Sequence, residues 1–274
     1  MKNLLNMIIL FSFPFAFTST AFSHTWHIKP NATGDAPTIQ AGIDSAMAGD
    51  TVLVDEGEYP IYEDIIMKNG VVLTSVSGPH FTRLISGEGA TPSWGIYCKD
   101  LDDTRTEVSG FWIEGFKWFS LGSGIVTDNV KGQIRENILV DNANGILSFN
   151  SGVLIENNTT HGNTYYGIRG TSGGELYNNI FWDRASGMDS FWFAMCNDFM
   201  NLEDAGLHGL NFQGEPEFCG IYGSGNYYLQ SDSPCAPGND PLGGTCGLIG
   251  ALPLNCGTVE AKKMSWGAIK ELFD

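Results

Sequence analysis

Four side chains that can exchange protons or bind ions recur at nearly constant spacing in the middle of the chain. They are Asp141, His161, Asp183 and Arg184, and the first three are 20 and 22 residues apart. If a repeat of about 21 residues stacks them, Asp141 and Asp183 lie two layers apart, roughly 10 Å, with His161 between them. We predict these four as catalytic residues, because such a group could do acid–base chemistry on a glycan or bind a cation. A register shift of one residue would scatter the cluster.

A repeat of 21 residues is the element that must position them. Asn137, Asn158 and Asn179 are separated by 21 and 21 residues. The same spacing relates a set of apolar residues, namely Ile134, Ile155 and Leu176. A fixed period of this length, without a helix in each repeat, is typical of a solenoid, and it fits one coil of a parallel β-helix. We therefore expect an inward apolar ladder and an asparagine ladder at a tight turn.

Extending this register predicts which residues share a column on the outer surface. One column holds Glu114, Val140, His161 and Trp182; the next holds Gly115, Asp141, Gly162 and Asp183; the third holds Phe116, Asn142, Asn163 and Arg184. Alternatively, each polar residue in these columns is an ordinary polar side chain on the surface.

The segment before the repeat predicts a short helix followed by strands. Residues 38–47 place Ile39, Ile43, Ala46 and Met47 on one stripe at helical spacing. The runs 51–54 and 71–74 are rich in β-branched residues and bounded by Gly, Asp and Asn, as short strands are. The order is thus one amphipathic helix and then many strands.

These segments also carry a family resemblance. TIQAGIDSA at 38–46, GDTVLV at 49–54 and GEY at 57–59 resemble the opening of right-handed parallel β-helix proteins of the pectin-lyase-like superfamily. The resemblance covers residues 26 to about 230. It implies an all-β fold, a right-handed parallel β-helix of about seven coils whose open end is capped by a short N-terminal helix. It leaves the reaction open.

The two ends of the chain have other signatures. Residues 1–23 have a basic start, an apolar run and small residues at Ala21 and Ser23, which is the layout of a secretory signal peptide cleaved near Ser23-His24. No later run is long and apolar enough to span a membrane. We expect the β-helix over 24–230, a Cys-rich closing segment over 231–256 and a tail over 257–274, and hence a secreted or cell-surface protein.

Six cysteines suit an oxidising compartment and predict disulfides. They lack the spacing of a structural zinc site. The best local pair is Cys235–Cys246, which would staple the Pro/Gly-rich loop between them, and the other pairings stay open.

Charge narrows the classes of partner. The chain has 14 Lys+Arg against 31 Asp+Glu and a net charge of −17, which argues against a nucleic-acid partner because phosphates need a basic face.

Three acids at Asp100, Asp102 and Asp103 could hold Ca²⁺, with a solvated turn as the alternative. The segment 183–212 breaks the period, so we expect a loop excursion packed on the solenoid flank.

Three functions remain. The first is an exported protein that binds polysaccharide along the solenoid face, which its many aromatic residues favour. The second is a polysaccharide lyase or glycoside hydrolase using Asp141, His161, Asp183 and Arg184. The third is a structural protein of the cell envelope. The oligomeric state stays open, because an uncovered end coil could stack with another chain.

Overall fold

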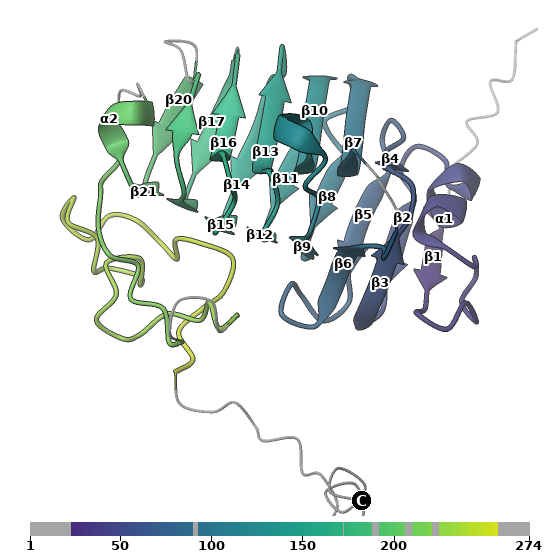
Figure 1. Ribbon diagram of the computed structural model, residues 1–274, viewed down its shortest axis with the longest axis horizontal. Coiled ribbons are helices and arrows are strands. Elements are labelled where there is room, and N and C mark those ends of the chain that lie inside the picture. Colours follow the sequence, from purple (N-terminus) through teal and green to yellow (C-terminus); the bar gives the residue numbers. More distant parts are fainter. Residues whose placement is uncertain are drawn as a thin grey trace, which may run out of the picture.

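The chain forms a right-handed parallel β-helix of about eight turns, seen in a computed structural model (Figure 1). The structure describes residues 23–89, 93–171, 173–187, 192–205, 210–220 and 225–256. The predicted fold class is confirmed, with about one coil more than expected. The predicted signal peptide, apart from Ser23, and the predicted tail over 257–274 lie outside the described residues.

Three parallel sheets form the walls of the solenoid, and from β2 onward each turn adds a strand to the first, second and third sheet in order. The first sheet contains β1 (Thr25–Ile28), β2 (Thr51–Val54), β5 (Val72–Ser75), β8 (Glu107–Ser109), β11 (Gln133–Arg135), β14 (Val153–Glu156), β17 (Gly174–Tyr177) and β20 (Trp192–Met195). The second contains β3 (Gly57–Ile61), β6 (Thr82–Ser86), β9 (Trp112–Glu114), β12 (Ile138–Val140), β15 (Thr159–His161), β18 (Ile180–Trp182) and β21 (Asp198–Phe199). The third contains β4 (Ile65–Ile66), β7 (Trp94–Leu101), β10 (Ser123–Val130), β13 (Asn144–Phe149), β16 (Tyr166–Gly170) and β19 (Ala185–Ser186).

The predicted apolar ladder fills the core of the solenoid. Ile134 pairs with Ile155, and Ile155 pairs with Leu176, on neighbouring strands of the first sheet. All three are buried, as is Val108, which pairs with Ile134 from the preceding turn. Because side chains alternate between the two faces of a strand, one inward position per strand repeats at every turn.

The predicted asparagine ladder is also present, and it is longer than expected. The backbone N–H of Asn137 donates to Oδ1 of Asn158 over 3.1 Å, and that of Asn158 donates to Oδ1 of Asn179 over 2.9 Å. The same contacts continue through Asn197 to Asn211. All five side chains are buried, so the ladder satisfies backbone groups that the turns would otherwise leave unpaired.

A short helix, α1 (Ile39–Ser45), caps the N-terminal end of the solenoid, as predicted. Its N-cap is Thr38, whose hydroxyl oxygen accepts from the N–H of Ala41. Ile39 and Ile43 are buried against the first turns. Met47, expected on the same stripe, is 72% exposed because the helix ends at Ser45. Among the described residues, no helix has the length and apolar character needed to cross a membrane.

The expected excursion over 183–212 proves to be part of the solenoid. Its described residues supply β19, β20 and β21, and β20 pairs in register with β17. A short helix, α2 (Leu202–Ala205), follows and lies next to β19 and β21. The period looked broken because these coils are shorter, with ladder asparagines only 18 and 14 residues apart.

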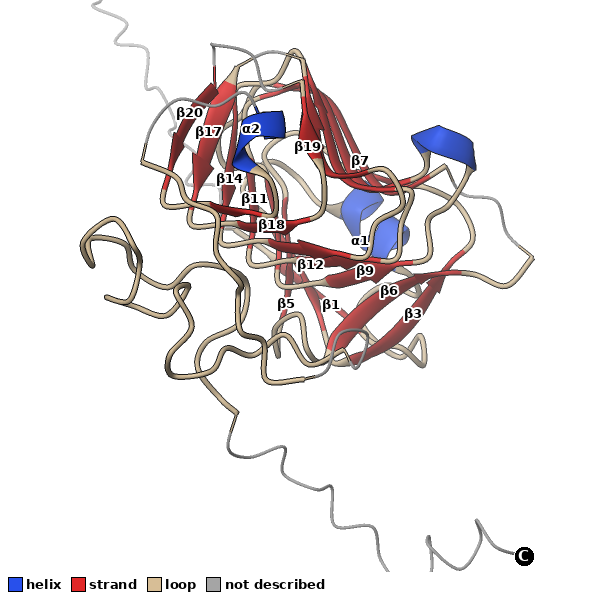
Figure 2. Cartoon of the chain, turned by 60° about the vertical axis from the view of Figure 1, so that its left-hand side comes forward, coloured by secondary structure: helices blue, strands red, loops and turns tan. Residues whose placement is uncertain are grey.

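After α2 the chain turns back and covers part of the second sheet (Figure 2). The described residues of 210–256, called the C-terminal segment below, contain no named strand or helix. Gly250 donates to the carbonyl of Asn178, and the N–H of Ala251 donates to Oγ1 of Thr159. Leu252 and Tyr227 pack on Ile138 in a buried apolar cluster. The segment therefore covers the outer face of the sheet through apolar packing and hydrogen bonds together.

Two disulfides fix this segment, and the predicted Cys235–Cys246 pair is wrong. Cys246 is bonded to Cys196, which ties the segment to the last turns, and Cys219 is bonded to Cys256. Cys235 is a buried free thiol. The loop that it was expected to staple is closed instead by Asp240, whose carboxylate accepts from the N–H groups of two residues within that loop, Leu242 and Cys246.

Candidate functional site

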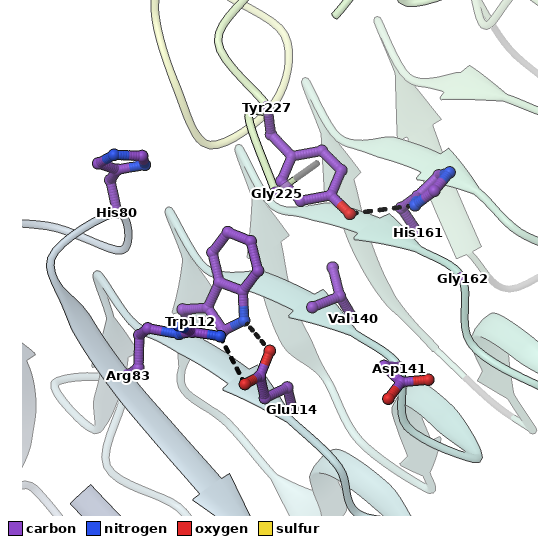
Figure 3. A pocket seen from close by; sticks show the side chains of 10 residues that line it. All are labelled: His80, Arg83, Trp112, Glu114, Val140, Asp141, His161, Gly162, Gly225 and Tyr227. Carbon is purple, nitrogen blue, oxygen red and sulfur yellow. Dashed lines mark hydrogen bonds and ion pairs between the residues drawn. The ribbon is translucent and has the colours of Figure 1, made fainter. Parts of the chain in front are cut away.

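A cleft of about 630 Å³ opens where the C-terminal segment stops covering the second sheet (Figure 3). Its floor comes from the outward side chains of β6, β9, β12 and β15, and Gly225 and Tyr227 of the C-terminal segment form one wall. The lining residues, called the cleft below, are His80, Arg83, Trp112, Glu114, Val140, Asp141, His161, Gly162, Gly225 and Tyr227.

Strand pairing explains which side chains meet in the cleft. Glu114 pairs with Val140, and Val140 pairs with His161. This is the outer column predicted from the repeat, and His161 pairs onward with Trp182 as expected. Arg83 and Trp112 pair with each other in the neighbouring outward column. The alternation of the strands thus brings an acid, an imidazole, an indole and a guanidinium to one surface.

The carboxylate of Glu114 is held from two sides. Nη2 of Arg83 donates to one of its oxygens over 2.6 Å, and Nε1 of Trp112 donates to the other over 2.6 Å. The Arg83 guanidinium also lies 5.1 Å from the centre of the Trp112 ring. Glu58 accepts a further hydrogen bond from Arg83, outside the cleft. Both oxygens of Glu114 are therefore oriented in advance, which lowers the entropy lost when a ligand binds.

His161 and Tyr227 face each other across the opposite part of the cleft. Nδ1 of His161 lies 3.1 Å from the Tyr227 hydroxyl, and their rings are 5.5 Å apart. Burial lowers the pKa of His161. Burial also raises the pKa of Tyr227, and the negative charges of Asp183, Glu114 and Asp141 raise it further. At neutral pH the pair is an uncharged imidazole and an uncharged phenol, able to accept or donate hydrogen bonds.

His80 completes the polar lining. Burial lowers the pKa of the His80 imidazole, and the positive charge of Arg83 lowers it further. Nδ1 of His80 and Nε of Arg83 are buried without a hydrogen-bond partner in the described part of the chain. Native proteins rarely leave such atoms unpaired, so this part of the cleft has unused hydrogen-bonding capacity.

The four predicted site residues fall in two separate places. Asp141 and His161 both line the cleft. Asp141 lies at the edge, in a turn with a positive φ of 54°, and forms an ion pair with exposed Lys117. Asp183 and Arg184 do not reach the cleft.

The placement predicted for Asp183 is wrong by one residue. The N–H and Nδ2 of Asn163 both donate to the carboxylate of Asp183, at 3.1 and 2.7 Å. Asp183 therefore continues the ladder of Asn142 and Asn163, with which Arg184 was expected to align. The turn before it is one residue shorter than in the previous coil, and this shifts the register. Asp183 is buried, and burial raises its pKa to about 6. Arg184 is exposed and lies over the ring of Tyr166.

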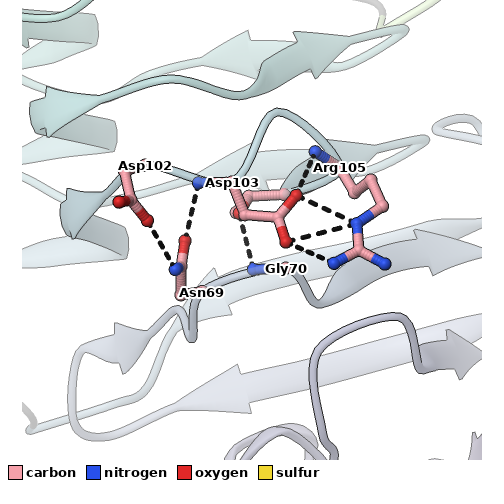
Figure 4. Close-up of polar contacts among 6 residues, drawn as sticks. Asn69, Gly70, Asp102, Asp103 and Arg105 are labelled. Atoms are coloured by element: carbon pink, nitrogen blue, oxygen red, sulfur yellow. Dashed lines mark hydrogen bonds and ion pairs between the residues drawn. The ribbon is translucent and has the colours of Figure 1, made fainter. Parts of the chain in front are cut away.

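The three acids proposed to hold Ca²⁺ have protein partners, and Figure 4 shows those of Asp102 and Asp103. Asp103 binds Arg105, which lowers the pKa of the Asp103 carboxyl to about 2. Asp102 accepts from Asn69, and Asp100 accepts from Asn129. Within the described ranges, no group of three or more His, Cys, Asp or Glu is arranged to hold a metal ion. Calcium binding at this turn stays a prediction.

Several cleft residues were missed from sequence. Glu114 was in the predicted column but was not singled out, and Trp112 was one of many aromatics. Arg83 lies upstream of the recognisable repeats. Tyr227 carried no signal, because only the folding back of the C-terminal segment brings it to His161.

Comparison with protein-family models, with curated proteins and with solved structures found no match to this chain. The function of the chain is therefore inferred from its fold and from the cleft.

Proposed function

We propose that this chain is an exported carbohydrate-binding protein that holds a glycan in the cleft. The observation that carries the proposal is the Glu114 carboxylate, oriented by Arg83 and Trp112 at the floor of the cleft. Sugars offer adjacent hydroxyl groups that both donate and accept hydrogen bonds. A carboxylate and a guanidinium fixed side by side are complementary to such a pair of hydroxyls.

The rest of the cleft supports the same class of ligand. Its volume of about 630 Å³ is within the range of small-molecule sites. Val140, Trp112 and Tyr227 also line the cleft and add apolar atoms that the C–H groups of a sugar can contact. The resemblance to the pectin-lyase-like superfamily supports a carbohydrate ligand, and two disulfides are compatible with export.

The first test is a glycan array probed with the purified protein, followed by titration calorimetry with each glycan retained. We expect Glu114→Gln to weaken binding about tenfold or more, because the amide loses the charge-assisted contacts. Glu58→Gln is the matched control, since Glu58 contacts the same Arg83 but lies outside the cleft. Binding by Glu114→Gln equal to wild type, or no retained glycan, would contradict the proposal.

A second candidate function is cleavage of the bound glycan by a glycoside hydrolase or polysaccharide lyase. It is favoured by the presence of Asp141 and His161 in the same cleft as Glu114. Since Val140 pairs with Glu114, the α-carbons of Glu114 and Asp141 are roughly 6 Å apart, from the strand spacing and rise. Two carboxylates and a neutral imidazole could act as acid, base or nucleophile.

Turnover separates this candidate from binding alone. Reducing ends and the absorbance of unsaturated products should be followed with each glycan that the array retains. If the protein is an enzyme, Asp141→Asn and His161→Gln should abolish product formation while glycan binding persists. Binding without any product would leave the carbohydrate-binding function and exclude cleavage of those glycans.

A further inference from the structure

The five arginines of the chain differ in how their charge is compensated. Three form ion pairs, with Glu58 and Glu114 for Arg83, Asp103 for Arg105 and Glu107 for Arg135. In a chain with 31 acidic and 14 basic residues, such pairing is easily satisfied. Arg169 and Arg184 form no ion pair with any residue in the described ranges. Among the described residues, no acidic side chain therefore compensates the charge of these two arginines.

The same two arginines lie against one aromatic ring. The guanidinium carbons of Arg169 and Arg184 are 5.3 and 5.5 Å from the centre of the Tyr166 ring. Because the two distances share one ring centre, the guanidinium carbons lie within about 11 Å of each other. Both side chains are exposed, and Tyr166 is half-buried.

Backbone contacts fix the positions from which these side chains extend. Arg169 is on β16 and pairs with Ser186 of β19. The carbonyl of Arg184 accepts from the N–H of Gly167, the residue after Tyr166. The two arginines thus come from adjacent turns of the solenoid and are held beside one ring by strand pairing and by cation–π contact.

The acid next to Arg184 in the sequence does not neutralise it. Asp183 precedes Arg184, but its side chain is buried and both oxygens accept from Asn163. Two like charges within about 11 Å of each other repel, and an anion near both guanidinium groups lowers this repulsion. Guanidinium groups are also well suited to carboxylate and sulfate, to which they donate paired hydrogen bonds.

We infer that Arg169, Tyr166 and Arg184 form a binding site for an oxyanion group, a carboxylate or a sulfate ester, of an acidic glycan. The inference rests on the proposed function and names the charge of its ligand. Gly162 lines the cleft, and only three residues separate it from Tyr166. We therefore expect a glycan that extends from the cleft past Gly162 to contact the arginine pair.

Three forms of one polymer test the inference: dextran, carboxymethyl dextran and dextran sulfate of matched length. Binding is measured by biolayer interferometry over a series of salt concentrations. We expect wild type to bind at least one charged form and not dextran, with affinity falling as salt rises. The charged form that binds distinguishes carboxylate from sulfate recognition.

The decisive variant is Arg169→Gln with Arg184→Gln, which should weaken binding about tenfold or more and flatten its dependence on salt. The matched control is Lys99→Gln with Lys131→Gln, two exposed lysines whose loss changes the net charge equally. Thermal unfolding checks that both double variants are folded. Equal weakening in both variants, or no binding of either charged polymer by wild type, would overturn the inference.

The two proposals fail in different ways. Glu114→Gln changes the cleft and leaves both arginines in place, so it should not alter binding of the charged dextrans. If those polymers bind through the arginines but no array glycan depends on Glu114, the anion site stands and the cleft assignment falls. If array glycans depend on Glu114 while the double arginine variant binds charged dextrans like wild type, the opposite holds.

Discussion

Replacing Asp183 by asparagine should stabilise the protein at neutral pH. Asp183 occupies a ladder position whose equivalents in the two previous turns are Asn142 and Asn163. At those positions one amide oxygen accepts from the previous turn, and the amide nitrogen donates to a backbone carbonyl. The Oδ1 of an asparagine at position 183 can accept both bonds from Asn163, as the Oδ1 of Asn158 does from Asn137, without placing a charge in a buried site.

The size of the effect follows from the pKa of Asp183. Burial raises this pKa from 3.8 to about 6. Between about pH 4 and pH 6 the folded protein therefore holds a proton that the unfolded chain has released, so wild-type stability falls as pH rises through this window. The loss is complete above the folded pKa and amounts to about 3 kcal/mol. Asparagine does not titrate, so its advantage over wild type should grow from near zero at pH 4 to about 3 kcal/mol at pH 7.

Thermal and urea unfolding of both proteins, at several pH values from 4 to 8 with the disulfides oxidised, measures this difference. Comparing variant with wild type cancels the titration of every other group. Asp141→Asn is the matched control, because it removes the same charge from an exposed turn and should lose only a weak ion pair with Lys117. A difference for Asp183→Asn that is independent of pH, or a less stable variant at pH 7, would refute the reasoning.

Three further predictions concern the core and the C-terminal segment. Burial raises the pKa of Asp198, which accepts from Gly214 and Cys235, to about 7; the stabilising effect of Asp198→Asn should therefore keep growing with pH until about pH 7 in the same unfolding series. Replacing Cys196 and Cys246 by serine removes a disulfide that closes a loop of 50 residues, and this should lower the free energy of unfolding by about 4 kcal/mol in urea unfolding. We also expect glycan binding to be lost, because the Tyr227 wall of the cleft loosens. Ile155→Ala should cost about 2–5 kcal/mol in the same assay, because it opens a cavity in the inward ladder, and a loss below 1 kcal/mol would contradict continuous packing of that ladder.

The repeat was readable from sequence because each ladder is made by residues one period apart. Ile134, Ile155 and Leu176 contact one another through adjacent strands, so their spacing in the chain directly reflects their spacing along the axis. The same argument placed Val140 and His161 correctly. It failed at Asp183, where a turn shorter by one residue shifts the register and hydrogen bonding alone reveals the true partner, Asn163.

The C-terminal segment could not be predicted in this way, because its contacts are not periodic. Cys246 bonds to Cys196 across 50 residues, whereas Cys235 was closer in sequence. A group other than a disulfide can also close a short loop between two cysteines. Here the Asp240 carboxylate does so. Tyr227 contacts His161 across 66 residues, and no repeat in the sequence indicates this contact.

The cleft lies where the outward residues of the second sheet change from mostly apolar to charged. Along one outward column the residues are Arg83, Trp112, Ile138, Thr159 and Ile180. The C-terminal segment packs on Trp112, Ile138 and Ile180, and the N–H of Ala251 donates to Oγ1 of Thr159. Beyond Trp112 the segment contacts His80 through Tyr228 but leaves Arg83 and Glu114 open to the cleft, and covering these charges would carry a high desolvation cost. The charged pair therefore limits how far the segment can extend, and at its edge a fixed wall meets an open, oriented carboxylate, which is the geometry that a ligand site needs.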